Sequence, residues 1–438
     1  MKINSIYSLL RTVLAAGMVM AFVLPTTGCG GSDEKPSHKP PVIIDPKDPK
    51  DPEDPEDPNI EPSVTLRIVD SNATPETKAL MANLWRLQNE GKYMFGHHDD
   101  LLYGHAWNWG QANESTNKGS DTRAVCGEYP AVFSLDFATM IDNRRAGDTW
   151  ANNLRIAAMK DAYARGEVIT ACIHINNPRT LGDSWTPGAE ASVWPDIIQP
   201  GSNIYNTFIS WLDNLADMAN NLKDNNGTLI PVLFRPFHEH TQSWSWWQTN
   251  CTSAQFIELW QMTIKYLRDT KGVHNFLYAI SPQIDSYSNA NTTRDRILYR
   301  WMGDEWVDFL GMDCYHGSNY SSLTNNLVVM DQVSQEKMKP CGVTETGLEG
   351  IATPNPSGTP VSAYWTNGVV TPFNNRKVSM VVMWRNETGS THFFSVWPGH
   401  ASEGSFMTMY NNANSVFGNA LAGGIMYKMP KGYAVKGY

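Results

Sequence analysis

The segment IPVLFRPFHEHTQSWSWW, residues 230–247, joins an apolar run to a cluster of titratable and aromatic side chains. Its first part, Ile230–Phe237, is short, apolar and contains β-branched residues, as buried strands do. Arg235, His238 and Glu239 then follow where this strand would end. The segment alone is compatible with a metal site, a packed core or a wall of rings beside a catalytic acid.

Apolar runs of the same kind recur along the chain, separated by stretches with the apolar spacing of amphipathic helices. We expect eight strands, at Tyr93–His97, Ala131–Phe137, Val168–Ile175, Ile230–Phe237, Phe276–Ser281, Phe309–Tyr315, Cys341–Thr346 and Ser379–Arg385. Helices are expected at Asn152–Arg165, Asn206–Leu222, Ala254–Thr270 and Asn291–Met302. This alternation predicts an α/β fold, a (β/α)8 TIM barrel in one domain, and no internal repeat indicates a propeller or solenoid.

Polar and titratable residues stand at the carboxyl ends of six of these strands. They are Gly96-His97-His98-Asp99-Asp100, His174-Ile175-Asn176-Asn177-Pro178, Arg235-Pro236-Phe237-His238-Glu239, Asp313-Cys314-Tyr315, Thr344-Glu345-Thr346-Gly347 and Trp384-Arg385-Asn386. In a TIM barrel these ends meet on one rim, where the chemistry takes place. The pattern therefore predicts an active site on that rim.

Glu239 and Glu345 are the two carboxylates expected on the rim. A retaining glycosidase needs two such groups, about 5–5.5 Å apart, one as acid and base and the other as nucleophile. The structural alternative is that each Glu pairs with an Arg or caps a helix. Because Glu239 follows a predicted strand and is flanked by His238 and three Trp, we favour the catalytic interpretation.

The histidines could also indicate a metal site, but their spacing does not favour one. His238 and His240 lack the His-Glu-x-x-His pattern, because Gln242 stands two residues after His240. His97 and His98 are neighbours in a strand and so point to opposite sides. We expect no metal and no cofactor, and a hydrogen-bonded core position for one of this pair.

The tryptophans that follow Glu239 have different expected positions. Trp244 lies five residues after Glu239, on the loop that leaves the strand, and is expected to line a cleft. Trp246 or Trp247 is expected in the core. Trp384 ends the last strand, where an indole face suits the apolar face of a pyranose ring.

The cysteines indicate buried thiols more than disulfides. Five of the six Cys follow residue 62, an odd number that cannot all pair. Cys172, Cys314 and Cys341 lie in apolar runs and are expected in the core. A thiol nucleophile at Cys314, beside Tyr315, is disfavoured because no base motif precedes it.

The first 62 residues indicate export and a tether. Residues 1–28 have a basic start and an apolar run, Val13–Leu24, that is shorter than the roughly 20 residues of a membrane span. Small residues then precede Cys29, as in the signals of bacterial lipoproteins, so we expect a lipid on Cys29; a plain signal peptide is the alternative. Residues 29–62 include a proline-rich charged repeat, which predicts an extended spacer.

These features predict a catalytic domain at 63–438, held by a lipid anchor at the outer membrane or cell surface of a Gram-negative bacterium. The formal net charge of −10 disfavours nucleic acid as a partner. We expect a monomer.

Several motifs, in order, resemble glycoside hydrolase family 26, best known for β-1,4-mannanases. RPFHEHTQSWSWW resembles its acid/base motif and GVTETG (342–347) its nucleophile motif. MFGHHDDLLYGHAW (94–107) resembles its first-strand motif, and MVVMWRN (380–386) and VWPGH (396–400) resemble its C-terminal signatures. The resemblance extends from about residue 65 to the end of the chain.

The resemblance implies retaining hydrolysis of β-1,4-mannosidic linkages in mannan, galactomannan or glucomannan. Glu239 would be the general acid/base and Glu345 the nucleophile. The residues implied to bind or orient the substrate are His174, His238, Trp244, Tyr315, Trp384 and Arg385. Those implied to support the site are Arg235, Asp313 and His98.

One departure bears on the substrate. Some mannanases of the family have an aromatic residue shortly after the nucleophile, whereas Leu348 and Gly350 stand here. A mixed-linkage β-glucanase or a β-xylanase of the same family is therefore an alternative. A non-catalytic surface glycan-binding lipoprotein is another, although it would need the aromatic residues and not both Glu239 and Glu345.

Overall fold

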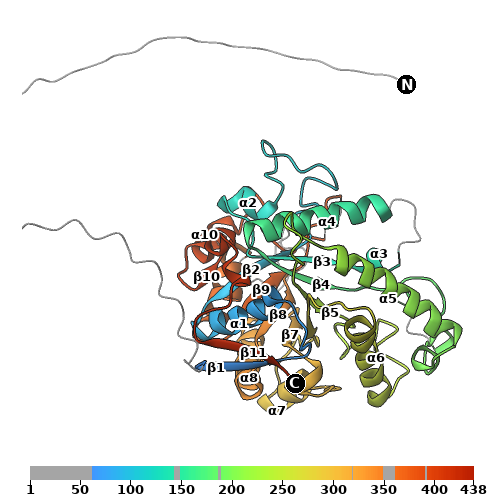
Figure 1. Ribbon diagram of the computed structural model, residues 1–438. Coiled ribbons are helices and arrows are strands. Elements are labelled where there is room, and N and C mark those ends of the chain that lie inside the picture. Colours follow the sequence, from blue (N-terminus) through green and yellow to red (C-terminus); the bar gives the residue numbers. More distant parts are fainter. Residues whose placement is uncertain (1–61, 143–147, 186–188, 318, 349–360, 390–391) are drawn as a thin grey trace, which may run out of the picture. The chain divides into compact units, whose positions relative to one another are not determined.

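The computed structural model describes residues 62–142, 148–185, 189–317, 319–348, 361–389 and 392–438. Its main element is a closed barrel of eight parallel strands (Figure 1). These are β2 (Tyr93–His98), β3 (Val132–Asp136), β4 (Val168–Cys172), β5 (Val232–Arg235), β6 (Phe276–Ile280), β7 (Phe309–Cys314), β8 (Cys341–Thr346) and β9 (Met380–Met383). Each pairs with the next, and β9 pairs back with β2 through Met380 and Met94. The TIM-barrel prediction is confirmed.

Helices surround the barrel and follow its strands (Figure 1). They are α1 (Pro75–Asn89), α2 (Asp121–Cys126), α3 (Ala138–Ile141), α4 (Asp148–Arg165), α5 (Asn203–Asn221), α6 (Ser253–Lys265), α7 (Ala290–Ile297), α8 (Tyr320–Lys337), α9 (Thr371–Phe373) and α10 (Glu403–Tyr410). The four predicted helices correspond to α4–α7. Helices α1 and α8 were not predicted, although α1 has local signals: the Thr74 hydroxyl caps it and Pro75 opens it.

The side chains that point into the barrel change in character from one end to the other. The lower half of the interior, at the amino ends of the strands, is apolar and includes Leu233, Leu277 and Phe309, which pack in one buried cluster with residues of α1. The upper half, at the carboxyl ends, is polar and includes Arg235 and Asp313. Alternate residues of one strand thus supply both halves, since successive side chains point to opposite faces.

The two ends of the described chain pair outside the barrel. Strands β1 (Val64–Ile68) and β11 (Tyr433–Gly437) form a parallel two-stranded sheet, the terminal clasp, which was not predicted. The clasp lies at the amino ends of the barrel strands: the Val69 amide donates to Asp308, immediately before β7, over 2.7 Å. The short strand β10 (Ser415–Val416) pairs with β2.

The described residues also bear on the N-terminal and cysteine predictions. Residues 1–28, Cys29 and the spacer up to residue 61 lie outside them. Within them, no helix combines the length and apolar character needed to cross a bilayer. The five cysteines of this part of the chain are free thiols, and the three that were expected in the core are buried.

Candidate active site

Glu239 is held by a strained turn at the end of β5. Phe237 and Glu239 have φ of +51° and +54°, in the left-handed region that side-chain-bearing residues rarely adopt. The turn is fixed by backbone bonds: the Glu239 amide donates to the Ser281 carbonyl over 2.6 Å, and Gln248 donates to the Glu239 carbonyl over 2.9 Å. Strain of this kind persists where the surroundings enforce it, commonly at active sites.

Glu345 is placed by an irregularity in β8. The register of β7 against β8 shifts, so that Met312 pairs with Val343 but Asp313 pairs with Glu345. In a regular strand, Thr344 and Glu345 would point to opposite sides. Here both reach the same polar network, because a β-bulge of this kind redirects a side chain.

Arg235 is the centre of that network and is fully buried. It donates to Asp313 Oδ1 over 3.0 Å and to Glu345 Oε1 over 2.6 Å. Thr344 and Ser281 each donate to Asp313 Oδ1 over 2.7 Å. One guanidinium group thereby pairs with two buried carboxylates. Without this pairing, each of the three groups would be an uncompensated charge in the interior, which is strongly destabilising.

Tyr315 completes the surroundings of Glu345. Its hydroxyl donates to Glu345 Oε2 over 3.0 Å, so that both carboxylate oxygens accept hydrogen bonds. Burial and the neighbouring Glu345 raise the pKa of Tyr315 well above its usual value. The phenol therefore stays protonated and remains a donor at neutral pH.

Glu239 has a different electrostatic environment. Burial raises its pKa well above the usual value, and the negative charges of Glu345 and Asp313 raise it further. Carboxylate oxygens of these three residues lie within 4.8 Å of one another. Burial also raises the pKa of Asp313, to about 7, against the effect of Arg235. Arg235 bonds to Asp313 and Glu345 and not to Glu239, so Glu239 is the best placed of the three to act as an acid.

These groups open onto a cleft of about 530 Å³ on the upper rim. Its lining residues are Asp136, His174, Trp185, Glu239, Trp244, Gln283, Tyr315, Glu345, Trp384, Arg385, His392 and Phe394. Most substrate-binding residues implied by the sequence are therefore brought together here. Trp246 and Trp247 are both buried in the core.

Trp384 forms an aromatic surface in this cleft with support from two histidines. The His98 ring stacks on its inner side, with centroids 4.1 Å apart. Its indole N–H donates to His392 over 3.1 Å. His98 also bonds to Ser134, whereas its sequence neighbour His97 pairs with Asp100 at 2.9 Å. His97 and His98 therefore have different partners. Both are buried.

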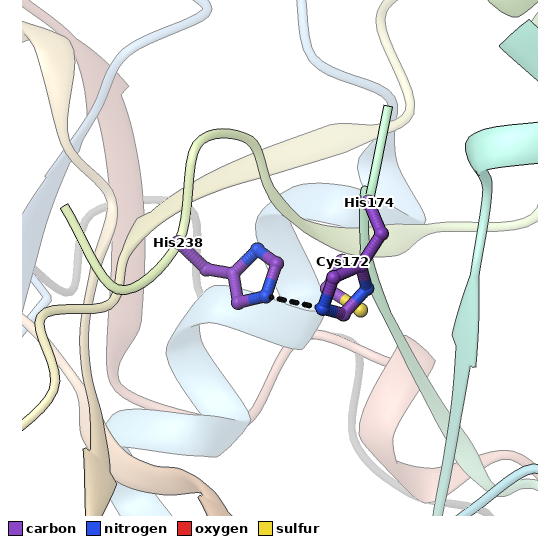
Figure 2. Close-up of side chains that lie close together, drawn as sticks. All are labelled: Cys172, His174 and His238. Carbon is purple, nitrogen blue, oxygen red and sulfur yellow. Dashed lines mark hydrogen bonds between the residues drawn. The ribbon is translucent and has the colours of Figure 1, made fainter. Parts of the chain in front are cut away.

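His238 does not line the cleft itself but contacts His174, which does. The two Nε2 atoms lie 3.2 Å apart (Figure 2), and His174 Nδ1 bonds to Asp136 at 2.7 Å. Burial opposes the charge on His174, but Asp136 outweighs it and raises the His174 pKa. Burial lowers the His238 pKa well below its usual value. His174 thus links Asp136 to His238, with one ring nitrogen bonded to each.

Two groups of side chains have donor atoms close enough to share a metal ion. One is Cys172, His174 and His238 (Figure 2), and the other is Glu239, Asp313 and Glu345. In the first, burial raises the Cys172 pKa well above its usual value, which disfavours the thiolate that binds metals. In the second, Arg235 already supplies the positive charge. The chemistry of neither set favours a metal.

The sequence interpretation missed several lining residues, and the strands that carry them explain why. Asp136 ends the second barrel strand and Gln283 follows the fifth, and these two strand ends were not included among the six polar ones. Asp136 could have been noticed, because it is the single charged residue of its strand. Trp185 and Phe394 lie on long connections, where no strand end indicates a position.

A closed barrel with two facing carboxylates at its strand ends defines a glycoside hydrolase site. Comparison with known proteins identifies the family: the model of glycosyl hydrolase family 26 matches residues 69–347. The chain therefore belongs to glycosyl hydrolase family 26.

Individual relatives give the same result. A mannan endo-1,4-β-mannosidase of Bifidobacterium adolescentis is 35% identical over 310 residues, which are 67% of this chain and 29% of that enzyme. The chain thus matches less than a third of the length of that relative. A mannan endo-1,4-β-mannosidase of Bacillus subtilis is 25% identical over 65% of this chain and 75% of that enzyme.

Solved structures extend the comparison to almost the whole described barrel. A family 26 β-mannanase from Bacteroides ovatus is 34% identical, with a TM-score of 0.72, over 82% of this chain and 98% of that one. An endo-β-1,4-mannanase of Cellulomonas fimi is 29% identical, with a TM-score of 0.72, over 85% of this chain and 81% of that one.

Proposed function

We propose that this protein hydrolyses β-1,4-mannosidic linkages in mannan, galactomannan or glucomannan with retention of configuration. The observation that carries the proposal is the approach of the Glu239 and Glu345 oxygens to within 4.8 Å. Retaining enzymes hold their carboxyls about 5–5.5 Å apart, whereas inverting enzymes leave about 6.5–9.5 Å for a water molecule. The names of the relatives support mannan as the substrate.

In the first step, a Glu345 oxygen attacks the anomeric carbon of the reacting sugar. The glycosidic C–O bond breaks, and its electron pair goes to the leaving oxygen, which takes the proton of Glu239. The raised pKa of Glu239 keeps this proton available. Arg235 and Tyr315 hold Glu345 in position before the attack.

In the second step, a water molecule gives a proton to Glu239 and attacks the same carbon. The bond from Glu345 to the sugar breaks, and the carboxylate is restored. Two inversions at one carbon give net retention. Trp384 provides an apolar surface for the reacting sugar, and Arg385 can donate to the sugar next to it.

A panel of polysaccharides tests the substrate. Galactomannan, glucomannan, barley β-glucan and β-1,3-xylan are incubated with the protein, products are resolved by size, and the first anomer formed is identified by proton NMR. We expect shortened chains from the two mannans, with the β-anomer first. Cleavage of the glucan or xylan alone would replace the substrate assignment, and an α-anomer would exclude the retaining mechanism.

The roles of the two glutamates are tested with added azide. Glu239→Ala lacks the acid, so it should keep far more of its first step on an aryl β-mannoside, whose leaving group departs without a proton, than on mannan. Azide then attacks the glycosyl-enzyme and gives a β-glycosyl azide. An α-glycosyl azide from Glu239→Ala would mean that the roles are reversed.

We also propose that the chain is an exported monomeric lipoprotein, cleaved after Gly28 and held by a lipid on Cys29 at the surface of a Gram-negative cell. The apolar run before Cys29 and the proline-rich repeat after it support this. Mass spectrometry of the mature N-terminal peptide should find a diacylglyceryl Cys29, absent in Cys29→Ser. An unmodified N-terminus elsewhere contradicts the anchor.

A further inference from the structure

A cluster of side chains joins the loop that carries Glu239 to α6 and to the segment that follows α7. We call this cluster the outer brace, and its members are His240, Gln248, Phe256, Tyr299 and Arg300. All except Tyr299 are buried, and none of the five lines the catalytic cleft. The brace therefore lies outside the space that a substrate enters.

Arg300 is connected to Glu239 through one residue. Its Nη2 atom donates to the Gln248 carbonyl over 3.2 Å, and the Gln248 side chain donates to the Glu239 carbonyl over 2.9 Å. The oxygen of the same Gln248 side chain accepts from the Ser245 backbone N–H over 2.8 Å. Gln248 is thus held at its backbone and at its side chain, so a displacement of Arg300 would reach the backbone of Glu239.

His240 makes a second connection, from the residue after Glu239 to the same segment. Its Nε2 atom lies 3.0 Å from the Tyr299 carbonyl oxygen. Because a carbonyl only accepts, this nitrogen carries a proton and donates it. Burial lowers the pKa of His240 to about 3, so the ring is neutral at neutral pH. The ring also stacks on Phe256, with centroids 5.2 Å apart. Tyr299 and its neighbour Arg300 thus hold the Glu239 turn at two points.

Arg300 is itself in an unfavourable state. Its φ is +54°, in the left-handed region, and its side chain is buried. Within the described part of the chain no carboxylate pairs with it. Its guanidinium carbon instead lies 4.9 Å from the ring centroid of Phe256 and 5.1 Å from that of Tyr299. A strained backbone and a buried cation both cost stability, and strain of this kind gathers at functional positions.

The nucleophile has supports of its own. Glu345 is held by Arg235 and Tyr315, and neither belongs to the outer brace. Loss of the brace should relax the strained turn at Glu239 and leave the attacking carboxylate in place. An acid acts only within hydrogen-bond reach of the leaving oxygen, about 2.6–3.2 Å. A displaced Glu239 would therefore weaken protonation of the leaving group without weakening the attack.

We propose that Arg300 and His240 are positioning residues, which hold from outside the cleft the turn that aims Glu239 at the leaving oxygen. The inference rests on the proposed function, since it uses the role of Glu239 as acid. It implies that substitutions outside the cleft change which leaving groups the enzyme expels.

Two aryl β-mannobiosides with different leaving groups test the brace. Dinitrophenolate departs without a proton, whereas phenolate needs the acid, so their kcat/KM values separate attack from protonation. General acid catalysis contributes roughly 10²–10⁴-fold, so its partial loss in Arg300→Ala should lower kcat/KM for the phenyl glycoside roughly tenfold. The dinitrophenyl glycoside should be cleaved at nearly the wild-type rate. Arg300→Lys, which keeps the charge and a donor, should retain more of the phenyl rate than Arg300→Ala.

Two further variants test the connections without removing a charge. Gln248→Met keeps a side chain of similar size and removes the donor to the Glu239 carbonyl. His240→Phe keeps a ring beside Phe256 and removes the donor to the Tyr299 carbonyl. Each should show the same selective loss on the phenyl glycoside.

The matched control is Arg294→Ala on α7, whose guanidinium pairs with Glu336 of α8 over 2.8 Å. It should leave both rates unchanged. Equal losses on the two glycosides in Arg300→Ala and Gln248→Met would assign the brace a structural role and overturn the proposal. So would an unchanged phenyl rate in these variants. A wild type that cleaves both glycosides keeps the proposed function standing whatever the variants do, whereas one that cleaves neither overturns the function along with the brace.

Discussion

Leu233 and Arg235 point into the barrel from the same strand, two residues apart, and belong to its two different halves. The lower half gains free energy because apolar area leaves water. The upper half gives some of it back, because Arg235, Asp313 and Glu345 lose their hydration and replace it with ion pairs among themselves and with hydrogen bonds from neighbouring hydroxyl groups. The lower half therefore stabilises the fold. The buried charged groups of the upper half are accounted for by their place in the active site and not by a gain in stability.

The largest expected effect on the upper half is the loss of turnover when either catalytic glutamate is replaced. We expect Glu239→Ala and Glu345→Ala each to lower turnover on mannan by roughly 10³-fold or more, since water replaces neither the acid nor the nucleophile. Both variants should remain folded, which a thermal unfolding curve checks; Glu345→Ala should lose more stability than Glu239→Ala, because it takes one of two carboxylate partners from the buried Arg235. Near-normal turnover in either variant would contradict the role of that residue.

A pair of substitutions on β5 compares the two halves directly. Leu233→Ala should cost about 2–5 kcal/mol of unfolding free energy, measured by denaturant titration, with kcat unchanged where the protein is folded. Arg235→Met leaves Asp313 and Glu345 without their cation, so we expect a loss of about 3–5 kcal/mol and a large loss of kcat. A reduced kcat in folded Leu233→Ala would mean that the lower half contributes to catalysis as well as to stability, which contradicts the proposed division.

The pH dependence of turnover distinguishes the upper and lower halves through a smaller effect. Glu239 must be protonated, so turnover should fall as the pH rises through its raised pKa. Asp313→Asn removes a negative charge that raises this pKa, so the alkaline limb should move to lower pH. Asp308→Asn, at the other end of β7, should leave the limb in place. Burial raises the pKa of Asp308 to about 6, but Asp308 bonds only at the lower end.

The smallest expected effect is that of a chelator. Turnover measured with and without EDTA should agree, because carboxylates and Arg235 carry the charges of the proposed mechanism. A loss of rate that added divalent metal restores would make the cluster of Cys172, His174 and His238, or that of the three carboxylates, a metal site.

The strands were predictable because their signals are local. Each run of apolar, β-branched residues is read from a few neighbours, and the polar residues after it follow from the barrel topology. Glu239, Glu345 and Trp384 were found in this way. Helix α1 was missed although Thr74 and Pro75 mark its start.

Other features have no local signal. Val64 and Tyr433 pair across almost the whole described chain, and nothing near either residue indicates its partner. The bulge that lets Thr344 and Glu345 reach one network depends on how β7 and β8 fit together. The outer brace likewise joins segments that meet only in the folded barrel.

The terminal clasp has a mechanical consequence. With the lipid anchor proposed above, a polysaccharide bound at the upper rim and the chain before Val64 would pull on opposite ends of the barrel. The tension then runs largely along the backbones of the strands, their stiff direction, and only partly across the bonds between them. The ladder between β1 and β11 is the first set of hydrogen bonds to carry this load. Under the proposed anchoring, loss of this ladder would lengthen the attachment and leave the eight barrel strands, with the catalytic residues on them, closed.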